Sequence, residues 1–371
     1  MSEAPLVLVS GVSGFIAGWV AHGALKMGYR VRGTVRSLAN PKVDADLCPG
    51  SRYKIELCEA NLTDEESWTA AVEGCDYILH VASPFPLEEP KDPNDVIRPA
   101  VEGTLNVLKA ASKMAKPPKR VVVTSSCAAI FGGTDPRNRV YTDDDWTDPT
   151  SKKFPISTYY RSKLEAERAA WAFVASLPKD RTFELSTVNP CLVQGPMLSG
   201  SSCSSADVIK QLMLGEMPAL AHVTLGIVSV LDVARAHLLA MTVPEAAGKR
   251  FLLVNGNVTL KQMSNVLTKE FGPQGYKPTS MVAPSWLVRT MAFFGDSQAR
   301  IMSPLLGIEQ IMDPVNAKTV LKMPLAHDPS IILDMAYAAI AAGIIPDKSK
   351  DQSITKNYVR PQMDVSGIAG P

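Results

Sequence analysis

Along roughly the first half of the chain, short apolar runs alternate with longer stretches in which apolar residues recur every three or four positions. Short, nearly continuous apolar runs are typical of strands buried on both faces of a parallel sheet, and the longer stretches are typical of connecting helices. The pattern predicts an α/β fold with a doubly wound parallel sheet. We expect strands at 6–9, 29–35, 53–57, 77–81, 120–124 and 183–188, and helices up to about Lys26, at 101–115 and at 328–342.

The alternation ends after Pro190. A serine-rich stretch, 199–205, is expected to be a loop, and residues 251–254 a further strand. Residues 264–323 are rich in methionine and proline, which suggests a small, largely helical lobe. We therefore expect a dinucleotide-binding domain at 1–190, continued by about 228–258; a substrate-binding lobe at 191–227 and 259–346; and a loose polar tail at 347–371.

Composition narrows the class of protein. The 371 residues include 38 basic and 37 acidic side chains, which leaves no charge excess to attract nucleic acid. The six cysteines contain no CxxC pair and the five histidines have no ligand spacing, so neither a disulfide framework nor a metal site is expected. The uncharged stretch Ala4–Leu25 is long enough to span a bilayer, but it holds four glycines and no basic residue precedes it. We expect a cytoplasmic protein without a membrane partner.

A glycine-rich loop follows the first predicted strand and opens the first predicted helix. It reads SGVSGFIA over residues 10–17, with Gly11, Gly14 and the small Ala17 at three-residue spacing. Such a loop lets the backbone approach a pyrophosphate, which the N–H groups of the helix N-terminus then bind. A simple turn between strand and helix is the alternative reading. The position between a strand and a helix favours dinucleotide binding of the Rossmann type.

The segment after the second predicted strand indicates which dinucleotide is bound. No Asp or Glu occurs from Gly28 through Val43, whereas Arg36 follows the strand directly and Lys42 lies nearby. An acidic residue at this place binds the ribose 2′-hydroxyl of NAD, and an arginine suits the 2′-phosphate of NADP. The sequence therefore predicts NADP(H) as the cofactor.

Tyr159 and Lys163 form a candidate reacting pair. Of the nine tyrosines, Tyr159 alone has a lysine four residues later, and residues 159–175 are rich in helix formers. Residues four apart share one face of a helix, so the phenol and the ammonium can meet. A nearby cation favours the ionised phenol and would bring its pKa closer to working pH. A Tyr–Lys pair with a purely structural role is the alternative.

The hydroxyl of Ser126 is the third candidate. The run Thr124-Ser125-Ser126 follows the strand 120–124, at the carboxyl edge where open α/β sheets bind their ligands. A serine there can donate a hydrogen bond to a substrate oxygen. The alternative is an ordinary serine-rich strand end, which the order strand, loop and Tyr–Lys pair disfavours.

Together these motifs resemble the extended short-chain dehydrogenase/reductase superfamily over about residues 5–345, in the branch of dihydroflavonol, cinnamoyl-CoA and methylglyoxal or aldehyde reductases. They are SGVSGFIA, GTVRS, HVASPF, VEGTLNVL, VVVTSSCAAIF, YYRSK and NPCLVQGP. The resemblance implies that Ser126, Tyr159 and Lys163 are catalytic. It implies cofactor contacts from Gly11, Ser13, Gly14, Phe15, Ile16, Arg36, Lys42, Asn61, Leu62, Val81, Ala82, Ser83, Thr124, Ser125, Tyr159, Lys163, Pro190, Cys191, Leu192 and Val193.

Departures from the family patterns bear on the substrate. Dihydroflavonol reductases resemble this chain but carry an asparagine where Phe131 stands, and cinnamoyl-CoA reductases carry NWYCYGK where this chain reads STYYRSK. Many relatives carry Ala-Asp-Leu where this chain has Ala60-Asn61-Leu62, and Asn61 can still hydrogen-bond adenine. SSCAAIF and Ala17 are more similar to the aldehyde and methylglyoxal reductases.

The predicted function is therefore NADPH-dependent reduction of an aldehyde or ketone, with Tyr159 as proton donor. The partner is a small carbonyl compound, and the chain is expected to be a monomer or homodimer. The predicted substrate pocket is apolar and is lined by Ser83, Phe85, Phe131 and Tyr160, with residues of 191–230. The alternatives are a hydroxysteroid or sterol dehydrogenase, a nucleotide-sugar epimerase or dehydratase, and a non-catalytic NADP sensor.

Overall fold

A seven-stranded parallel sheet forms the centre of the computed structural model, which describes residues 3–44, 46–84, 90–137, 139–198 and 203–371. The strand order is β10-β7-β5-β4-β1-β2-β3, so the chain crosses from one half of the sheet to the other between β3 and β4. The predicted fold class, a doubly wound parallel sheet, is confirmed. The strands are β1 (Leu6–Val9), β2 (Arg30–Val35), β3 (Glu56–Glu59), β4 (Tyr77–His80), β5 (Arg120–Thr124), β7 (Glu184–Pro190) and β10 (Arg250–Leu253).

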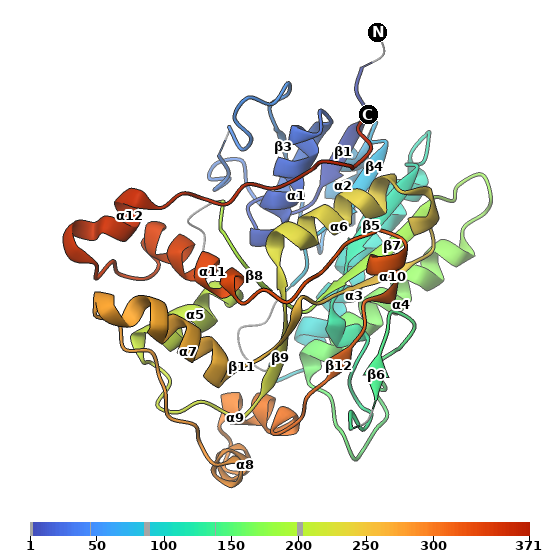
Figure 1. Ribbon diagram of the computed structural model, residues 1–371. Coiled ribbons are helices and arrows are strands. Elements are labelled where there is room, and N and C mark those ends of the chain that lie inside the picture. The colour runs from blue at the N-terminus through green and yellow to red at the C-terminus, as the bar shows by residue number, and fades with distance from the viewer. Residues whose placement is uncertain (1–2, 45, 85–89, 138, 199–202) are drawn as a thin grey trace.

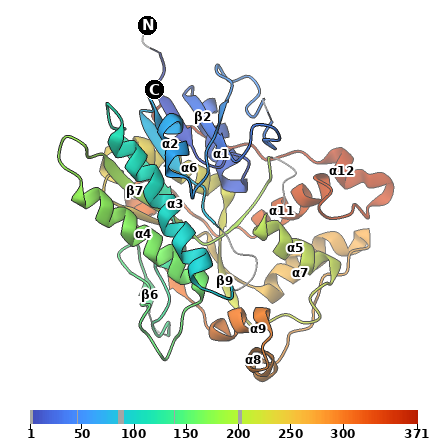
Figure 2. The ribbon, with the colours of Figure 1, turned by 180° about the vertical axis from the view of Figure 1, so that it is seen from behind.

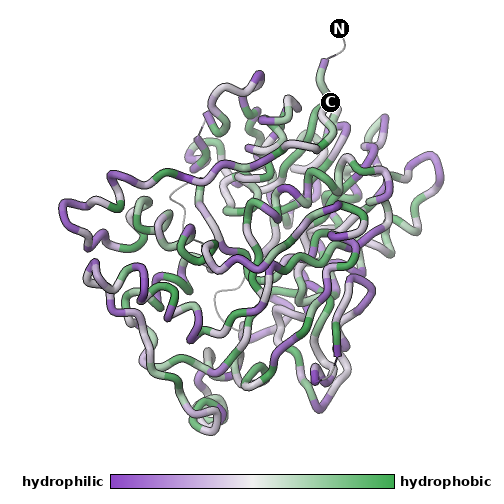
Figure 3. The backbone as a smooth tube through the Cα atoms, in the orientation of Figure 1, coloured by the Kyte–Doolittle hydropathy of each residue, from purple (hydrophilic) through white to green (hydrophobic). Residues whose placement is uncertain are grey.

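Helices cover both faces of this sheet (Figures 1 and 2). One face carries α1 (Phe15–Lys26) and α6 (Val230–Thr242), and the other carries α2 (Glu65–Val72), α3 (Asn94–Lys113) and α4 (Thr158–Ser176). Each face buries its own hydrophobic cluster, because the strand side chains alternate between the two sides. Hydrophobic positions accordingly gather along the strands and the helix faces that meet them, as the tube in Figure 3 shows.

A smaller lobe stands beyond the carboxyl ends of the strands. Its three-stranded sheet contains β8 (Leu192–Gln194), β9 (Thr224–Ser229) and β11 (Gly256–Thr259), and its helices share a separate hydrophobic cluster. A third sheet pairs β6 (Val140–Tyr141) with β12 (Ile311–Met312). The remaining helices are α5 (Ser204–Leu214), α7 (Leu260–Phe271), α8 (Ser285–Phe293), α9 (Ser297–Met302), α10 (Val315–Thr319), α11 (Ser330–Ala341) and α12 (Ser353–Asn357).

Three segments differ from the sequence expectation. The strand expected at 53–57 is β3, three residues later, because this edge strand is defined by pairing with β2 rather than by apolar content. The helix expected from Val101 begins at Asn94, since burial of Val96 and Ile97 in its first turn offsets the missing N–H of Pro99. Residues 317–325, expected in the small lobe, instead bury apolar side chains in the cluster that holds α1 and α6.

The polar tail, 347–371, is not loose. Met363 is buried beside Gly23 of α1, where a side chain on the glycine would come within 2.8 Å of the Met363 sulfur. Lys26 donates to the carbonyl of Met363 at 2.6 Å, and Arg235 of α6 donates to two further tail carbonyls. The tail follows α1 and α6 because their cations bind its backbone, a long-range contact that leaves no pattern in the tail sequence.

Candidate active site

Ser126 and Tyr159 meet at the carboxyl end of the central sheet. Ser126 follows β5 in extended conformation and caps the short 3₁₀ helix Cys127–Ala129, where its Oγ accepts a hydrogen bond from the Ala128 backbone N–H at 3.2 Å. The Tyr159 hydroxyl lies 3.4 Å from the same Oγ and donates to it. The serine is buried and the tyrosine is partly buried, so the pair is largely shielded from solvent.

Helix α4 carries both Tyr159 and Lys163, one turn apart. The side chain of Ser157 caps its N-terminus, which places Tyr159 in the first turn. The Lys163 ammonium is buried and donates to the Ser83 hydroxyl at 2.7 Å, just beyond β4. The structure thus brings together the three predicted reacting residues and Ser83 from the ends of neighbouring elements.

The phenol is not made more acidic here, which corrects the sequence expectation. Burial raises the pKa of Tyr159 to about 12, and this effect outweighs the hydrogen bond with Ser126, which lowers it. Burial also lowers the pKa of Lys163 to about 8. Both shifts favour the uncharged form, so the phenol keeps its proton at neutral pH and can donate it.

A buried ion pair lies beneath the serine loop and was missed at the sequence level. Glu167, on α4 one turn after Lys163, forms a 2.6 Å salt bridge with Arg250 at the start of β10. The Glu167 side chain is fully buried, and it also accepts hydrogen bonds from the Ser125 hydroxyl at 2.6 Å and from the Asn189 amide at 2.7 Å. The same amide donates to the Ser126 carbonyl. Glu167 therefore holds the loop that presents Ser126, and its four-residue spacing from Lys163 is the signal that could have found it.

Arg250 extends this network to the loop beyond β6. Its guanidinium stacks over the Trp146 ring at 3.8 Å and donates to the carbonyls of Asp143 and Asp145. The Asp143 carboxylate in turn accepts from the backbone N–H of Leu252 at 2.6 Å. Every one of these contacts spans a long sequence separation, so no local pattern predicts them.

The predicted dinucleotide loop has the geometry that a pyrophosphate needs. Gly11 has φ +69°, and a Cβ there would lie 3.0 Å from the Cβ of Ala82, so a larger residue would be strained at this position. The Gly14 N–H donates to the Gly11 carbonyl at 2.8 Å and closes the turn before α1. No side chain caps the N-terminus of α1 and no acidic residue lies in its first turn. The loop therefore fits a dinucleotide phosphate group.

The loop after β2 presents Arg36 and Lys42 as exposed side chains. Lys42 also lines a pocket with Gly14 and Phe15 at the start of α1. Glu59, at the end of β3, accepts a hydrogen bond from the Leu38 backbone N–H at 2.6 Å and so orders this loop. An acidic group thus reaches the loop from the neighbouring strand, which the sequence of the loop itself could not reveal.

Several residues that were predicted to contact the cofactor instead form hydrogen bonds with other protein residues through their side chains. The hydroxyl of Thr124 is hydrogen-bonded to His237 at 2.7 Å, and that of Ser125 is bound to Glu167. Asn61 is exposed, and its Oδ1 accepts from Thr63. The side chains of Thr124 and Ser125 are therefore engaged inside the fold.

The remaining predicted positions divide between the loop and the start of the small lobe. The Ser10 hydroxyl accepts from the backbone N–H groups of Val81 and Ala82, which fixes the end of β4 beside the dinucleotide loop. Pro190 ends β7, and Leu192 and Val193 belong to β8. Of the other predicted contacts, Ser13 lies in the loop and Ile16 in the first turn of α1, and the Leu62 carbonyl accepts a hydrogen bond from the Asn106 amide at 2.8 Å.

Apolar and aromatic side chains lie beside Tyr159. The rings of Phe131 and Tyr160 meet edge to face at 5.7 Å, within one hydrophobic cluster. The Cys191 thiol is buried in the same cluster, 3.5 Å from the sulfur of Met312. Phe85, the other predicted wall, lies outside the described residues.

Neither a metal centre nor a membrane span is found in the described ranges. No three His, Cys, Asp or Glu side chains gather there as metal ligands would. No helix of that part of the chain has the length and apolar character needed to cross a bilayer.

The chain matches known proteins along most of its length. The family model for NAD dependent epimerases and dehydratases matches residues 7–253. A cinnamoyl-CoA reductase of Petunia hybrida is 36% identical over 270 residues, which cover 72% of this chain and 77% of that protein. An anthocyanidin reductase of Vitis vinifera is 35% identical over 287 residues, covering 73% and 82%.

The matches with solved structures cover a still larger share of this chain. Gre2 of Candida albicans, in complex with NADPH, has a TM-score of 0.72 and 27% identity, and the match covers 91% of this chain and 99% of that one. The yeast methylglyoxal/isovaleraldehyde reductase Gre2, complexed with NADPH, has a TM-score of 0.72 and 25% identity, with coverages of 90% and 98%.

Proposed function

The chain belongs to the NAD dependent epimerase/dehydratase family, as its extended short-chain dehydrogenase/reductase motifs indicated, and we propose that it reduces an aldehyde or ketone to an alcohol with NADPH. It is an oxidoreductase, and the related reductases and the NADPH complexes of Gre2 support NADP(H) as cofactor. The observation that carries the proposal is the 3.4 Å contact between the Tyr159 hydroxyl and Ser126 Oγ. Tyr159 lies on the same helix as buried Lys163.

NADPH, when bound, supplies the hydride that reduces the carbonyl carbon. The Tyr159 phenol, whose pKa burial raises to about 12, holds its proton and donates it to the carbonyl oxygen. Ser126 Oγ accepts from the Ala128 N–H, and its own proton is left to donate to the same oxygen when Tyr159 donates to the substrate instead of to Ser126. Gly11, the N-terminus of α1 and Arg36 are the groups proposed to hold the dinucleotide, and Lys163 its nicotinamide ribose.

The substrate is proposed to be an apolar carbonyl compound of small or moderate size. Phe131 and Tyr160 form an aromatic wall beside Tyr159, and Phe131 stands where dihydroflavonol reductases place a polar side chain. The aldehyde reductase among the structural relatives supports this choice. A hydroxysteroid or sterol dehydrogenase would use the same reacting groups in the opposite direction, and it is the second candidate because the pocket wall is apolar.

The test is Tyr159→Phe, assayed by NADPH absorbance on a panel of aldehydes, diketones, flavanonols and sterols. We expect kcat to fall by about a thousandfold or more, because the proton donor is lost, while the Kd for NADPH stays within about threefold. Tyr160→Phe is the matched control, since it removes a neighbouring phenol of the same helix and should keep kcat within about tenfold. Turnover that survives Tyr159→Phe would refute the assigned proton donor.

A further inference from the structure

Large apolar side chains are exposed around helix α8, on the small lobe. Phe293, Phe294, Trp286 and Met281 are 82%, 81%, 67% and 63% exposed. Single exposed apolar residues are common on protein surfaces, but an aromatic-rich cluster in one short segment indicates an interaction surface. We call this surface the α8 patch; it comprises Met281, Val282, Trp286, Leu287, Met291, Phe293 and Phe294.

The outer face of the helix is largely aromatic and carries little charge. Val288 is its buried residue, and the direction opposite to Val288 is occupied by Trp286, Thr290 and Phe293, with Arg289 to one side. An ordinary surface helix places charged residues there. Figures 1 and 2 show α8 at one extremity of the molecule, so its outer face points away from the rest of the fold.

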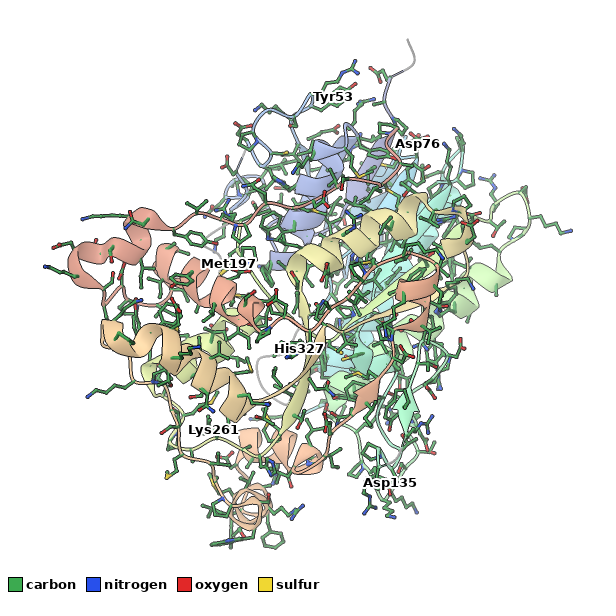
Figure 4. The ribbon with its side chains drawn as sticks, viewed as in Figure 1. Tyr53, Asp76, Asp135, Met197, Lys261 and His327 are labelled. Carbon is green, nitrogen blue, oxygen red and sulfur yellow. The ribbon has the colours of Figure 1, made fainter. Side chains whose placement is uncertain are left out.

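Most of the charges near the patch along the chain are positive. No acidic residue occurs between Glu270 and Asp296, whereas Lys277 and Arg289 are exposed within that stretch. Lys261, which Figure 4 labels, donates to the Ser280 carbonyl at 2.7 Å and adds a cation beside Met281. The acidic group that follows α8, Asp296, is engaged by the Ala299 backbone N–H at the start of α9.

These features fit a lipid surface better than a second copy of the chain. In a two-fold contact the patch would meet the same patch of the partner, which would bring the neighbouring cations Lys277 and Arg289 close to the cations of the partner. Anionic headgroups instead pair with the cations, while tryptophan and phenylalanine enter the boundary between headgroups and acyl chains.

We propose that the α8 patch docks the protein on an anionic membrane surface, with α8 lying in the interfacial plane. The attachment is peripheral: the aromatic side chains enter the lipid and the cations remain among the headgroups. This inference does not depend on the proposed reaction, because binding to vesicles is measured without turnover.

The test is co-sedimentation of the full chain with phosphatidylcholine vesicles that contain about one third phosphatidylserine, compared with phosphatidylcholine alone. We expect binding to the mixed vesicles, and a loss of about tenfold or more in the partition coefficient for W286S/F293S/F294S. These three side chains are largely exposed, so their replacement should leave NADPH binding and the thermal midpoint unchanged. Val359→Ser, at an 85% exposed apolar position of the tail, is the matched control and should bind like the wild type.

Three results would overturn the proposal. The first is a wild-type chain that stays in the supernatant with both kinds of vesicle, and the second is a triple variant that binds as well as the wild type. The third is a concentration-dependent dimer in sedimentation equilibrium that the triple variant abolishes, which would assign the patch to a second copy.

Discussion

Replacing Glu167 by glutamine tests whether the buried ion pair holds the active-site loop. The substitution preserves the size of the side chain and removes its charge. Arg250 then keeps a buried guanidinium without its carboxylate, at a place where the Glu167 and Arg250 side chains are 0% and 9% exposed. Ser125 and Asn189, which bracket Ser126, lose a charged acceptor in the same step.

The expected cost follows from this geometry. Removing one partner of a buried ion pair costs about 3–5 kcal/mol of the free energy of unfolding, because a desolvated charge is left behind. Arg250 keeps its hydrogen bonds to the carbonyls of Asp143 and Asp145, which offset part of that loss. We therefore expect about 3 kcal/mol, the lower end of that range.

Unfolding in guanidinium chloride, monitored by tryptophan fluorescence, gives the free energy of unfolding. Glu165→Gln is the matched control, because it breaks the exposed Arg161–Glu165 pair on the same helix and should cost less than about 0.5 kcal/mol. A second readout is kinetic: with the Ser126 loop less firmly held, kcat should fall while the Kd for NADPH changes little. If Glu167→Gln costs no more than Glu165→Gln and leaves kcat intact, the supporting role of the ion pair is wrong.

Two further predictions concern the cofactor and pH. Arg36→Ser should raise the Kd for NADPH about tenfold or more and leave the Kd for NADH unchanged, because a charge-assisted bond to the 2′-phosphate is lost. Arg30→Ser, at the far end of β2, is the control and should change neither Kd. An equal loss of affinity for both cofactors in Arg36→Ser would contradict the assignment. Burial lowers the pKa of His237 from 6.5 to about 4, so the native state binds fewer protons than the unfolded chain between these two pH values. The contribution of His237 to the free energy of unfolding is therefore complete above about pH 6.5 and decreases as the pH falls toward 4. Unfolding free energies measured across this range should decline less steeply in His237→Gln than in the wild type, and identical slopes would exclude His237 as a source of the decline.

Local patterns predicted the parts of the site that depend on local geometry. The loop at Gly11 and Gly14 lies between β1 and α1, as its place between an apolar run and a helical stretch indicated. Tyr159 and Lys163 lie one turn apart on α4, because residues four apart share a helix face. The electrostatics did not follow from spacing: the cation near Tyr159 suggested a more acidic phenol, but burial, which depends on the whole fold, raises its pKa instead.

The succession of strands and helices, and the chemistry carried by single turns and loops, can be predicted from the order of residues, since these features depend on spacing between near neighbours. Which of these elements meet depends on long-range packing. The Ser126–Tyr159 and Lys163–Ser83 contacts join residues 33 and 80 positions apart, Glu167 reaches Arg250 across 83, and Lys26 binds Met363 across 337. Such contacts are set by the order of strands in the sheet and by the packing of helices on it, and neither leaves a periodic trace in the chain.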